Sequence, residues 1–105
     1  MAFMMTEEMK VAVEKYKKEY DELYLVSCSY LRINTEEKLE GQWFLCHSMD
    51  DIKDIFSILK RFHSESKNWK LITDEKEKLV YSYTAGGYGI PEVDIQETLT
   101  VHKVA

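Results

Sequence analysis

The sequence predicts an α+β fold: a mainly antiparallel five-stranded sheet with two packed helices, in the order α-β-β-α-β-β-β. Two segments repeat apolar residues every three or four positions, which is the period of an amphipathic helix. Five other segments are rich in β-branched and aromatic residues and are bounded by charged or turn-forming residues. Because most of these strands follow one another without a helix between them, we expect hairpins and antiparallel pairing. With 105 residues, the chain 1–105 is expected to form a single α+β domain.

The first helix is expected over residues 6–22. Thr6 is a suitable N-cap, and the two glutamates after it suit the positive end of the helix dipole. The apolar positions at helical spacing are Met9, Val13, Tyr16, Tyr20 and Leu23. Residues 23–33 then alternate with apolar side chains on both faces, which predicts a strand covered on both sides. The polar stretch 34–41 is predicted to be a loop, and 42–48 is predicted to be the second strand.

The second helix is expected to begin after Ser48, which has the capping-box spacing to an aspartate three residues later. Its apolar stripe consists of Ile52, Ile55, Phe56, Leu59, Phe62 and His63. Three further strands are expected at 68–73, 79–84 and 93–104, where β-branched and aromatic residues gather. The charged DEKEK segment between the first two of these strands suits a hairpin loop.

The order of elements is similar to that of the profilin-like and roadblock-type small domains, although their closing helix has no counterpart in this sequence. The similarity is one of topology. It implies a sheet with helices packed on it, and no functional residue is transferred from those families.

The chain is acidic, with a formal net charge of −5. Phosphate contacts need clustered lysine and arginine, so we expect no binding to nucleic acid or to an anionic membrane. No apolar run approaches the ~20 residues of a membrane span. The N-terminal residues also lack the basic start of a signal peptide. These features predict a cytoplasmic protein.

Two cysteines and a histidine are the candidates for chemistry. If the first hairpin is centred on Glu37, Cys28 lies opposite Cys46 and Ser27 lies opposite His47. The first pair would allow redox chemistry or half of a metal site, but buried structural thiols are the favoured interpretation. The second pair would allow activation of a nucleophile, although the sequence supplies no third orienting group. No spacing of histidine and cysteine fits zinc, so we expect no metal and no cofactor.

The segment 84–94, TAGGYGIPEVD, holds three of the chain's four glycines. Phosphate loops lead into a helix, whose dipole holds the anion, whereas a proline and a β-branched strand follow here. We therefore expect a wide connection between strands, in which the glycines adopt positive φ and present a tyrosine. The predicted binding residues are Tyr81, Tyr83, Gly86, Gly87, Tyr88 and Gly89.

These observations favour a small acidic, non-enzymatic protein-interaction domain, such as an adaptor, an inhibitor or an immunity-type partner. It would bind through a tyrosine-bearing sheet face and the 85–91 glycine loop. The partner is expected to be another protein or a second copy of the chain. The alternative is a small-ligand-binding domain whose pocket, between sheet and helices, is gated by the same loop. An enzyme using His47 with Ser27 or Cys46 is the least supported class.

Overall fold

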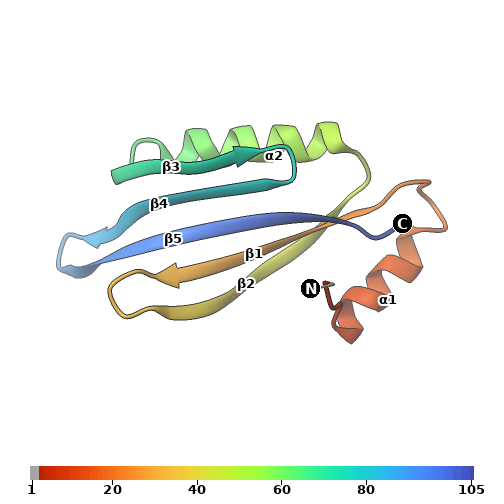
Figure 1. Cartoon of the computed structure of the whole chain (residues 1–105), viewed down its shortest axis with the longest axis horizontal. Coiled ribbons are helices and arrows are strands. Elements are labelled where there is room, and N and C mark those ends of the chain that lie inside the picture. The colour runs from red at the N-terminus through yellow and green to blue at the C-terminus, as the bar shows by residue number, and fades with distance from the viewer. Residues whose placement is uncertain (1–2) are drawn as a thin grey trace.

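The structure, a computed structural model, describes residues 3–105, which form two helices and a five-stranded antiparallel sheet (Figure 1). In chain order the elements are α1 (Glu7–Tyr16), β1 (Tyr24–Arg32), β2 (Glu37–Cys46), α2 (Met49–His63), β3 (Lys67–Glu75), β4 (Lys78–Gly87) and β5 (Ile90–Lys103). The predicted α+β class with a mainly antiparallel sheet is therefore confirmed.

The strands lie side by side in the order β2-β1-β5-β4-β3, so the last strand of the chain occupies the centre. β1 pairs with β2 on one side, and β5 pairs with β1 and with β4. α2 carries the chain from β2 to β3, which form the opposite edges of the sheet. Because β5 joins the first hairpin to the β3–β4 hairpin, its side chains contact residues from both halves of the chain.

The molecule is elongated, with extents of 48 × 26 × 26 Å. Its radius of gyration is 15.3 Å, against about 13 Å for a compact domain of this length. The β1–β2 and β4–β5 turns lie at the end of the sheet opposite α1, and the helices leave them uncovered (Figure 1). β1, predicted to be covered on both faces, is buried only over Tyr24–Val26, and its remaining residues are partly or fully exposed.

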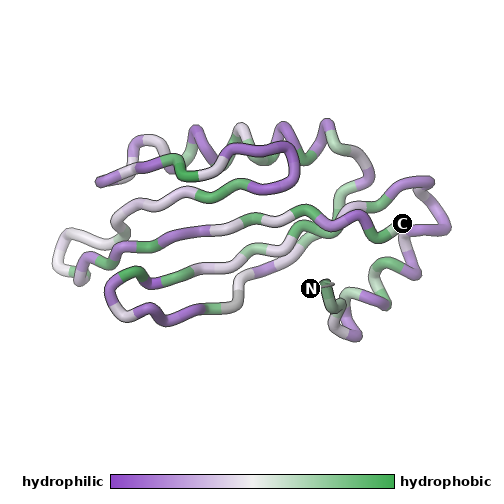
Figure 2. Tube along the Cα trace, in the orientation of Figure 1, coloured by the Kyte–Doolittle hydropathy of each residue, from purple (hydrophilic) through white to green (hydrophobic). Residues whose placement is uncertain are grey.

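The core lies between α2 and the sheet. Ser48 caps this helix as predicted, because its Oγ accepts the Asp51 backbone N–H at 3.1 Å. The buried helix residues Ile52 and Phe56 join a cluster of sheet residues that includes Leu99. Figure 2 shows hydrophobic stretches of β1 and β5 where these strands converge beside α2. Burial of each large apolar side chain stabilises the fold by about 1.5–3 kcal/mol.

α1 ends at Tyr16, although its apolar periodicity predicts a helix to residue 22. Thr6 caps the helix as expected, accepting the Met9 backbone N–H at 3.3 Å. Tyr20 continues the apolar spacing, but its ring stacks on His47 after the chain has left the helix. The chain must then be extended, because Leu23 exchanges backbone hydrogen bonds with the last residues of the chain. Tertiary pairing thus overrides helix propensity over residues 17–22.

The first hairpin is tighter than predicted. β2 begins at Glu37, so most of the expected loop 34–41 is strand. The polarity of this stretch reflects its position on an edge strand, where solvent reaches the backbone, and not the absence of a strand. The observed register pairs Tyr24 with Cys46 and Ser27 with Trp43. Neither Cys28–Cys46 nor Ser27–His47 pairing occurs, so both predictions, which rested on a hairpin centred on Glu37, were wrong.

A bulge beside Cys28 changes the β1–β2 register partway along the hairpin. Placing the strands symmetrically about one central residue therefore cannot give the correct pairs. The pairing of β1 with β2 shifts between Ser27 and Ser29. At this place Gly41 lies against the β1 backbone, and a Cβ at Gly41 would lie 2.2 Å from the carbonyl oxygen of Cys28. Only glycine allows this close approach of two backbones.

The predicted strands in the second half of the chain are present and are longer than predicted. They include most of the residues that were expected to form the glycine loop. β4 runs through Gly87 and β5 begins at Ile90, so the turn consists of Tyr88 and Gly89 and not of a wide connection. Both turn residues have positive φ, of 53° and 89°. Positive φ at both central residues is typical of the tight turns whose twist matches that of a hairpin. The predicted positive φ of the glycines is confirmed at Gly86, Gly87 and Gly89.

Candidate functional site

The end of the sheet opposite α1 carries exposed apolar side chains on two neighbouring turns. The ring of Tyr88 is fully exposed at the β4–β5 turn, and Ile90 beside it is also exposed. Ile33 and Leu39 are exposed in and next to the β1–β2 turn. The Ile33 backbone N–H donates to the carbonyl of Asp94 at 3.0 Å, which links the two hairpins. We call Ile33, Leu39, Tyr88 and Ile90 the distal tip.

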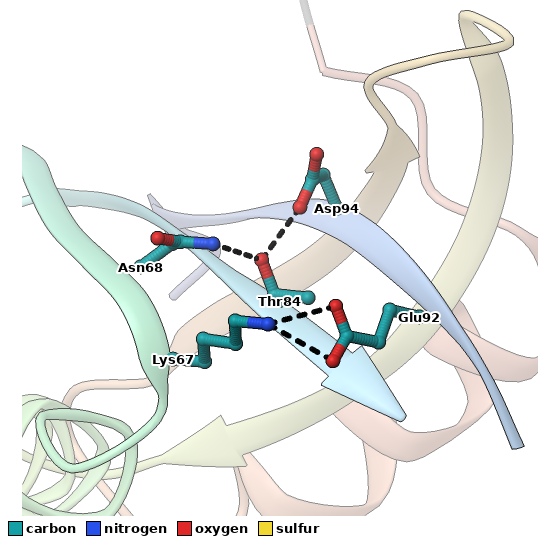
Figure 3. Close-up of polar contacts among 5 residues, drawn as sticks. All are labelled: Lys67, Asn68, Thr84, Glu92 and Asp94. Carbon is teal, nitrogen blue, oxygen red and sulfur yellow. Dashed lines mark hydrogen bonds and ion pairs between the residues drawn. The ribbon is translucent and has the colours of Figure 1, made fainter. Parts of the chain in front are cut away.

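Polar contacts anchor the base of the β4–β5 hairpin to β3 (Figure 3). Lys67 Nζ lies 3.0 Å from both carboxylate oxygens of Glu92. Asn68 Nδ2 donates to Thr84 Oγ1 at 2.9 Å, and the Thr84 hydroxyl donates to Asp94 Oδ1 at 2.6 Å. Exposed pairs of this kind add little to stability. They add side-chain contacts between β3 and the base of the hairpin to the backbone pairing of β4 and β5.

Tyr81 and Tyr83 meet a buried carboxylate on the face of the sheet beneath α2. Tyr81 is fully buried, and its hydroxyl donates to Glu97 Oε2. Tyr83 is half-buried and donates to Glu97 Oε1 at 2.5 Å. Glu97 itself is 7% exposed, and His63 Nε2 lies 4.0 Å from its Oε1. A buried carboxylate is tolerated here because hydrogen-bond donors surround it.

Burial and the charge of Glu97 keep the neighbouring tyrosine hydroxyls and the Cys28 thiol protonated. Burial, followed by the hydrogen bond to Glu97, raises the pKa of Tyr81 and of Tyr83 above the ordinary tyrosine value of 10. Burial and the charge of Glu97 raise the pKa of the Cys28 thiol to about 11. The reactive form of cysteine is the thiolate, so Cys28 is a poor nucleophile at neutral pH. Burial also raises the pKa of Cys46.

Glu97 is not among the residues predicted from the sequence, although its position along the strand carries a signal. Glu97 is two and four residues from Leu99 and Val101, which are both buried. Alternate residues of a strand face the same side, so this spacing places a carboxylate in the core. Its partners on β4 cannot be identified until β4 and β5 are known to pair with Tyr81 opposite Glu97.

The structure separates the predicted binding residues into two groups. Tyr81 and Tyr83 lie together beneath α2 and bind Glu97, whereas Tyr88 lies at the distal tip. Gly86, Gly87 and Gly89 form the backbone on either side of Tyr88. Tyr88 is therefore exposed to solvent, whereas Tyr81 supports the sheet from within.

The histidines make contacts that differ from those predicted. His47 stacks on Tyr20 and lies 3.4 Å from a carboxylate oxygen of Asp51. Ser27 Oγ lies 3.2 Å from Nε2 of His102, which reaches it from β5. Burial lowers the pKa of His102, and among the described side chains no ion pair involves this histidine. The contact therefore lacks the third orienting group of a catalytic triad.

Among the side chains that the structure describes, no group of three from histidine, cysteine, aspartate or glutamate could hold a metal ion. The same residues include no helix long and apolar enough to cross a membrane. Comparison of the chain with protein-family models, with curated proteins and with solved structures finds no match in any of the three.

Proposed function

We propose that the protein is a small non-enzymatic interaction domain that contacts another protein through the distal tip. The observation that carries this proposal is the conformation of Tyr88. Its φ of 53° belongs to the hairpin turn, at a position where glycine, asparagine or aspartate is usual and another residue costs about 1–2 kcal/mol. Its ring is fully exposed, so packing within the domain does not explain a large aromatic residue there. A binding partner would give this ring a contact.

The surroundings of Tyr88 suit an interface. Tyrosine offers a large apolar ring with a polar end, and it is enriched among the residues that dominate binding energy. Ile90 beside it adds exposed apolar area, and Ile33 and Leu39 add more on the neighbouring hairpin. The contacts of Lys67 and Thr84 hold the hairpin at its base, which reduces the entropy lost on binding. Two partners fit this surface: a different protein, or a second copy of the chain.

The alternative of a ligand pocket gated by residues 85–91 gains no support from the geometry. Ala85 pairs with Val93 and Gly87 pairs with Ile90 in the sheet. A gate would have to break these backbone hydrogen bonds, and the turn that remains is too short to act as a lid.

The test is capture of partners from the source cells by tagged wild-type protein and by Tyr88→Ala, quantified by mass spectrometry. Tyr88→Ala should lower capture about 30-fold, since a dominant interface residue contributes about 2 kcal/mol. Its melting temperature should stay within about 4 °C of wild type, because an exposed side chain contributes less than 0.5 kcal/mol to stability. Sedimentation velocity tests whether the partner is a second copy.

The matched control is Phe62→Ala, which removes another exposed aromatic ring from a different surface, on α2. It should leave capture unchanged. The proposal fails if Tyr88→Ala captures the same proteins in the same amounts as wild type, or if both variants lose them equally.

A further inference from the structure

An aromatic hollow lies at the other end of the molecule from the distal tip, between α1 and β2. Its volume is about 400 Å³, within the range of small-ligand sites, roughly 300–1,000 Å³. The aromatic residues that line it are Tyr16, Tyr20, Trp43 and His47. Apart from Cys46, the other lining side chains are aliphatic. The hollow is independent of the proposed interaction surface.

The early end of α1 positions the tyrosine rings of this hollow. Tyr16 is the last residue of the helix, and its carbonyl accepts the backbone N–H of Tyr20 at 3.1 Å. The ring of Tyr20 lies parallel to His47, with centroids 4.6 Å apart and planes 7° apart. His47 is in turn held 3.4 Å from Asp51. The aromatic wall is therefore fixed before any ligand arrives.

Carboxylates surround this wall on its outer side. An adjoining hollow shares Tyr20 and His47 and adds Glu19, Asp21 and Glu22. Glu22 lies 3.8 Å from the ammonium of a lysine on β5, whereas no ion pair between side chains that the structure describes involves Glu19 or Asp21. The faces of aromatic rings are electron-rich, so rings and carboxylates together favour a positive ligand.

The chain contains an example of this interaction. The ammonium of Lys15 lies 5.2 Å from the centroid of the Tyr16 ring, within the ~6 Å of a cation–π contact. The ring of Tyr16, which lines the hollow, thus already attracts a cation.

We propose that the hollow binds an organic cation of the alkylammonium class, such as a trimethylammonium group. Its methyl groups pack on Tyr16, Tyr20 and Trp43, and its charge is balanced by Glu19 and Asp21. A compact, strongly hydrated ammonium would lose too much hydration against aliphatic and aromatic walls, whereas methyl groups cover the charge and lower this cost. The source is a free small molecule or an N-methylated lysine of a protein.

The test is an NMR titration with choline and with 3,3-dimethylbutan-1-ol, which has the same shape without the charge. The protein offers an internal reference, because Trp43 lines the hollow and Trp69 packs on Tyr81 beneath α2. Choline should shift the indole N–H of Trp43 and leave that of Trp69 in place. It should bind at least about 10-fold more tightly than the alcohol, as expected for one or more cation–π contacts. Equal affinities, or a Trp43 signal that moves with neither, overturn the proposal.

Variants locate the site. Tyr20→Leu removes a ring and should weaken choline binding about 10-fold, whereas Tyr20→Phe keeps the ring and should bind as wild type. Asp21→Asn changes only an exposed charge and should weaken choline binding about 3-fold at low salt. This variant still tests the proposal if Tyr20→Leu proves to be unfolded in its NMR spectrum. Unchanged affinity in both Tyr20→Leu and Asp21→Asn overturns the proposal. Peptides with and without trimethyllysine then identify the source: tighter binding of the methylated peptide than of choline assigns a protein, and the reverse assigns a free cation.

Discussion

Replacing Tyr81 with phenylalanine deletes one hydroxyl group and leaves the shape of the core unchanged. In wild type that hydroxyl is fully buried and donates to the Glu97 carboxylate. A hydrogen bond to a charged group contributes about 1.5–3 kcal/mol. We expect Tyr81→Phe to lose about 2 kcal/mol of the roughly 5–15 kcal/mol that stabilises a domain of this size. Tyr83 continues to donate to the carboxylate, so the variant should remain folded.

The loss should depend on pH, with a sign that follows from the pKa. Burial, and then the hydrogen bond to Glu97, raises the pKa of Tyr81 in the folded protein above its ordinary value of 10. The folded state therefore holds the phenolic proton at pH values where the unfolded chain has released it. The contribution of Tyr81 is fully present below about pH 10 and is lost as the pH rises further. Between pH 10 and 11 the wild-type advantage over Tyr81→Phe should shrink by about 1 kcal/mol.

Urea titrations of both proteins at pH 8, 10 and 11 measure this difference. With a slope of about 2 kcal/mol per molar urea, the midpoint of Tyr81→Phe should be about 1 M lower at pH 8. Lysine deprotonation affects wild type and variant alike, so it cancels in the difference. Tyr88→Phe is the matched control, because it deletes the same hydroxyl from an exposed ring and should stay within 0.5 kcal/mol. A difference between Tyr81→Phe and wild type that stays constant or grows above pH 10 would refute the assignment of Tyr81 as a buried donor.

The remaining predictions concern the glycine hairpin and the thiols. Gly86→Ala and Gly87→Ala both place a side chain at positive φ, of 107° and 113°, but only at Gly86 does the new Cβ meet backbone, 2.4 Å from the Pro91 carbonyl oxygen. Thermal unfolding should show Gly87→Ala losing about 1 kcal/mol and Gly86→Ala losing at least about 2 kcal/mol; equal losses would contradict the close contact. Native Cys28 should react slowly with a disulfide reagent at pH 8 and rapidly in urea, since its pKa is about 11; a fast native reaction would show that the thiol is ionised.

The parts of the fold that the sequence predicts are those determined by neighbours along the chain. The caps at Thr6 and Ser48 and most of the apolar stripe of α2 depend on residues within a few turns of helix, and they are present as expected. Phe62, which was predicted to belong to the stripe, is exposed instead. The alternation of β-branched and aromatic residues likewise marks the strands of the second half. These signals are local, so a single sequence contains them in full.

The first hairpin shows why the rest could not be predicted. Its register depends on a bulge that brings Gly41 against the backbone of Cys28, and nothing in the local sequence distinguishes this glycine from one in a loop. A shift of one residue in the register moves every side chain of the strand to the opposite face of the sheet. The expected Cys28–Cys46 and Ser27–His47 pairs are therefore both absent. The correct serine partner, His102, is 75 positions away in sequence. Such pairs become visible only when the strand order is known.

The distribution of buried residues explains how the two ends of the molecule can serve different ligands. The core lies beneath α2, and the Glu97 cluster closes it on the side towards the distal tip. Beyond that cluster the strands are held by backbone pairing and by contacts such as Lys67–Glu92, which contribute little to global stability. Substitutions at the distal tip should therefore change binding without unfolding the protein.

The aromatic hollow depends instead on where α1 ends, because an α1 continued to residue 22 would carry Tyr20 away from His47. One departure from helix periodicity thus creates a hollow that could not be predicted from the local sequence.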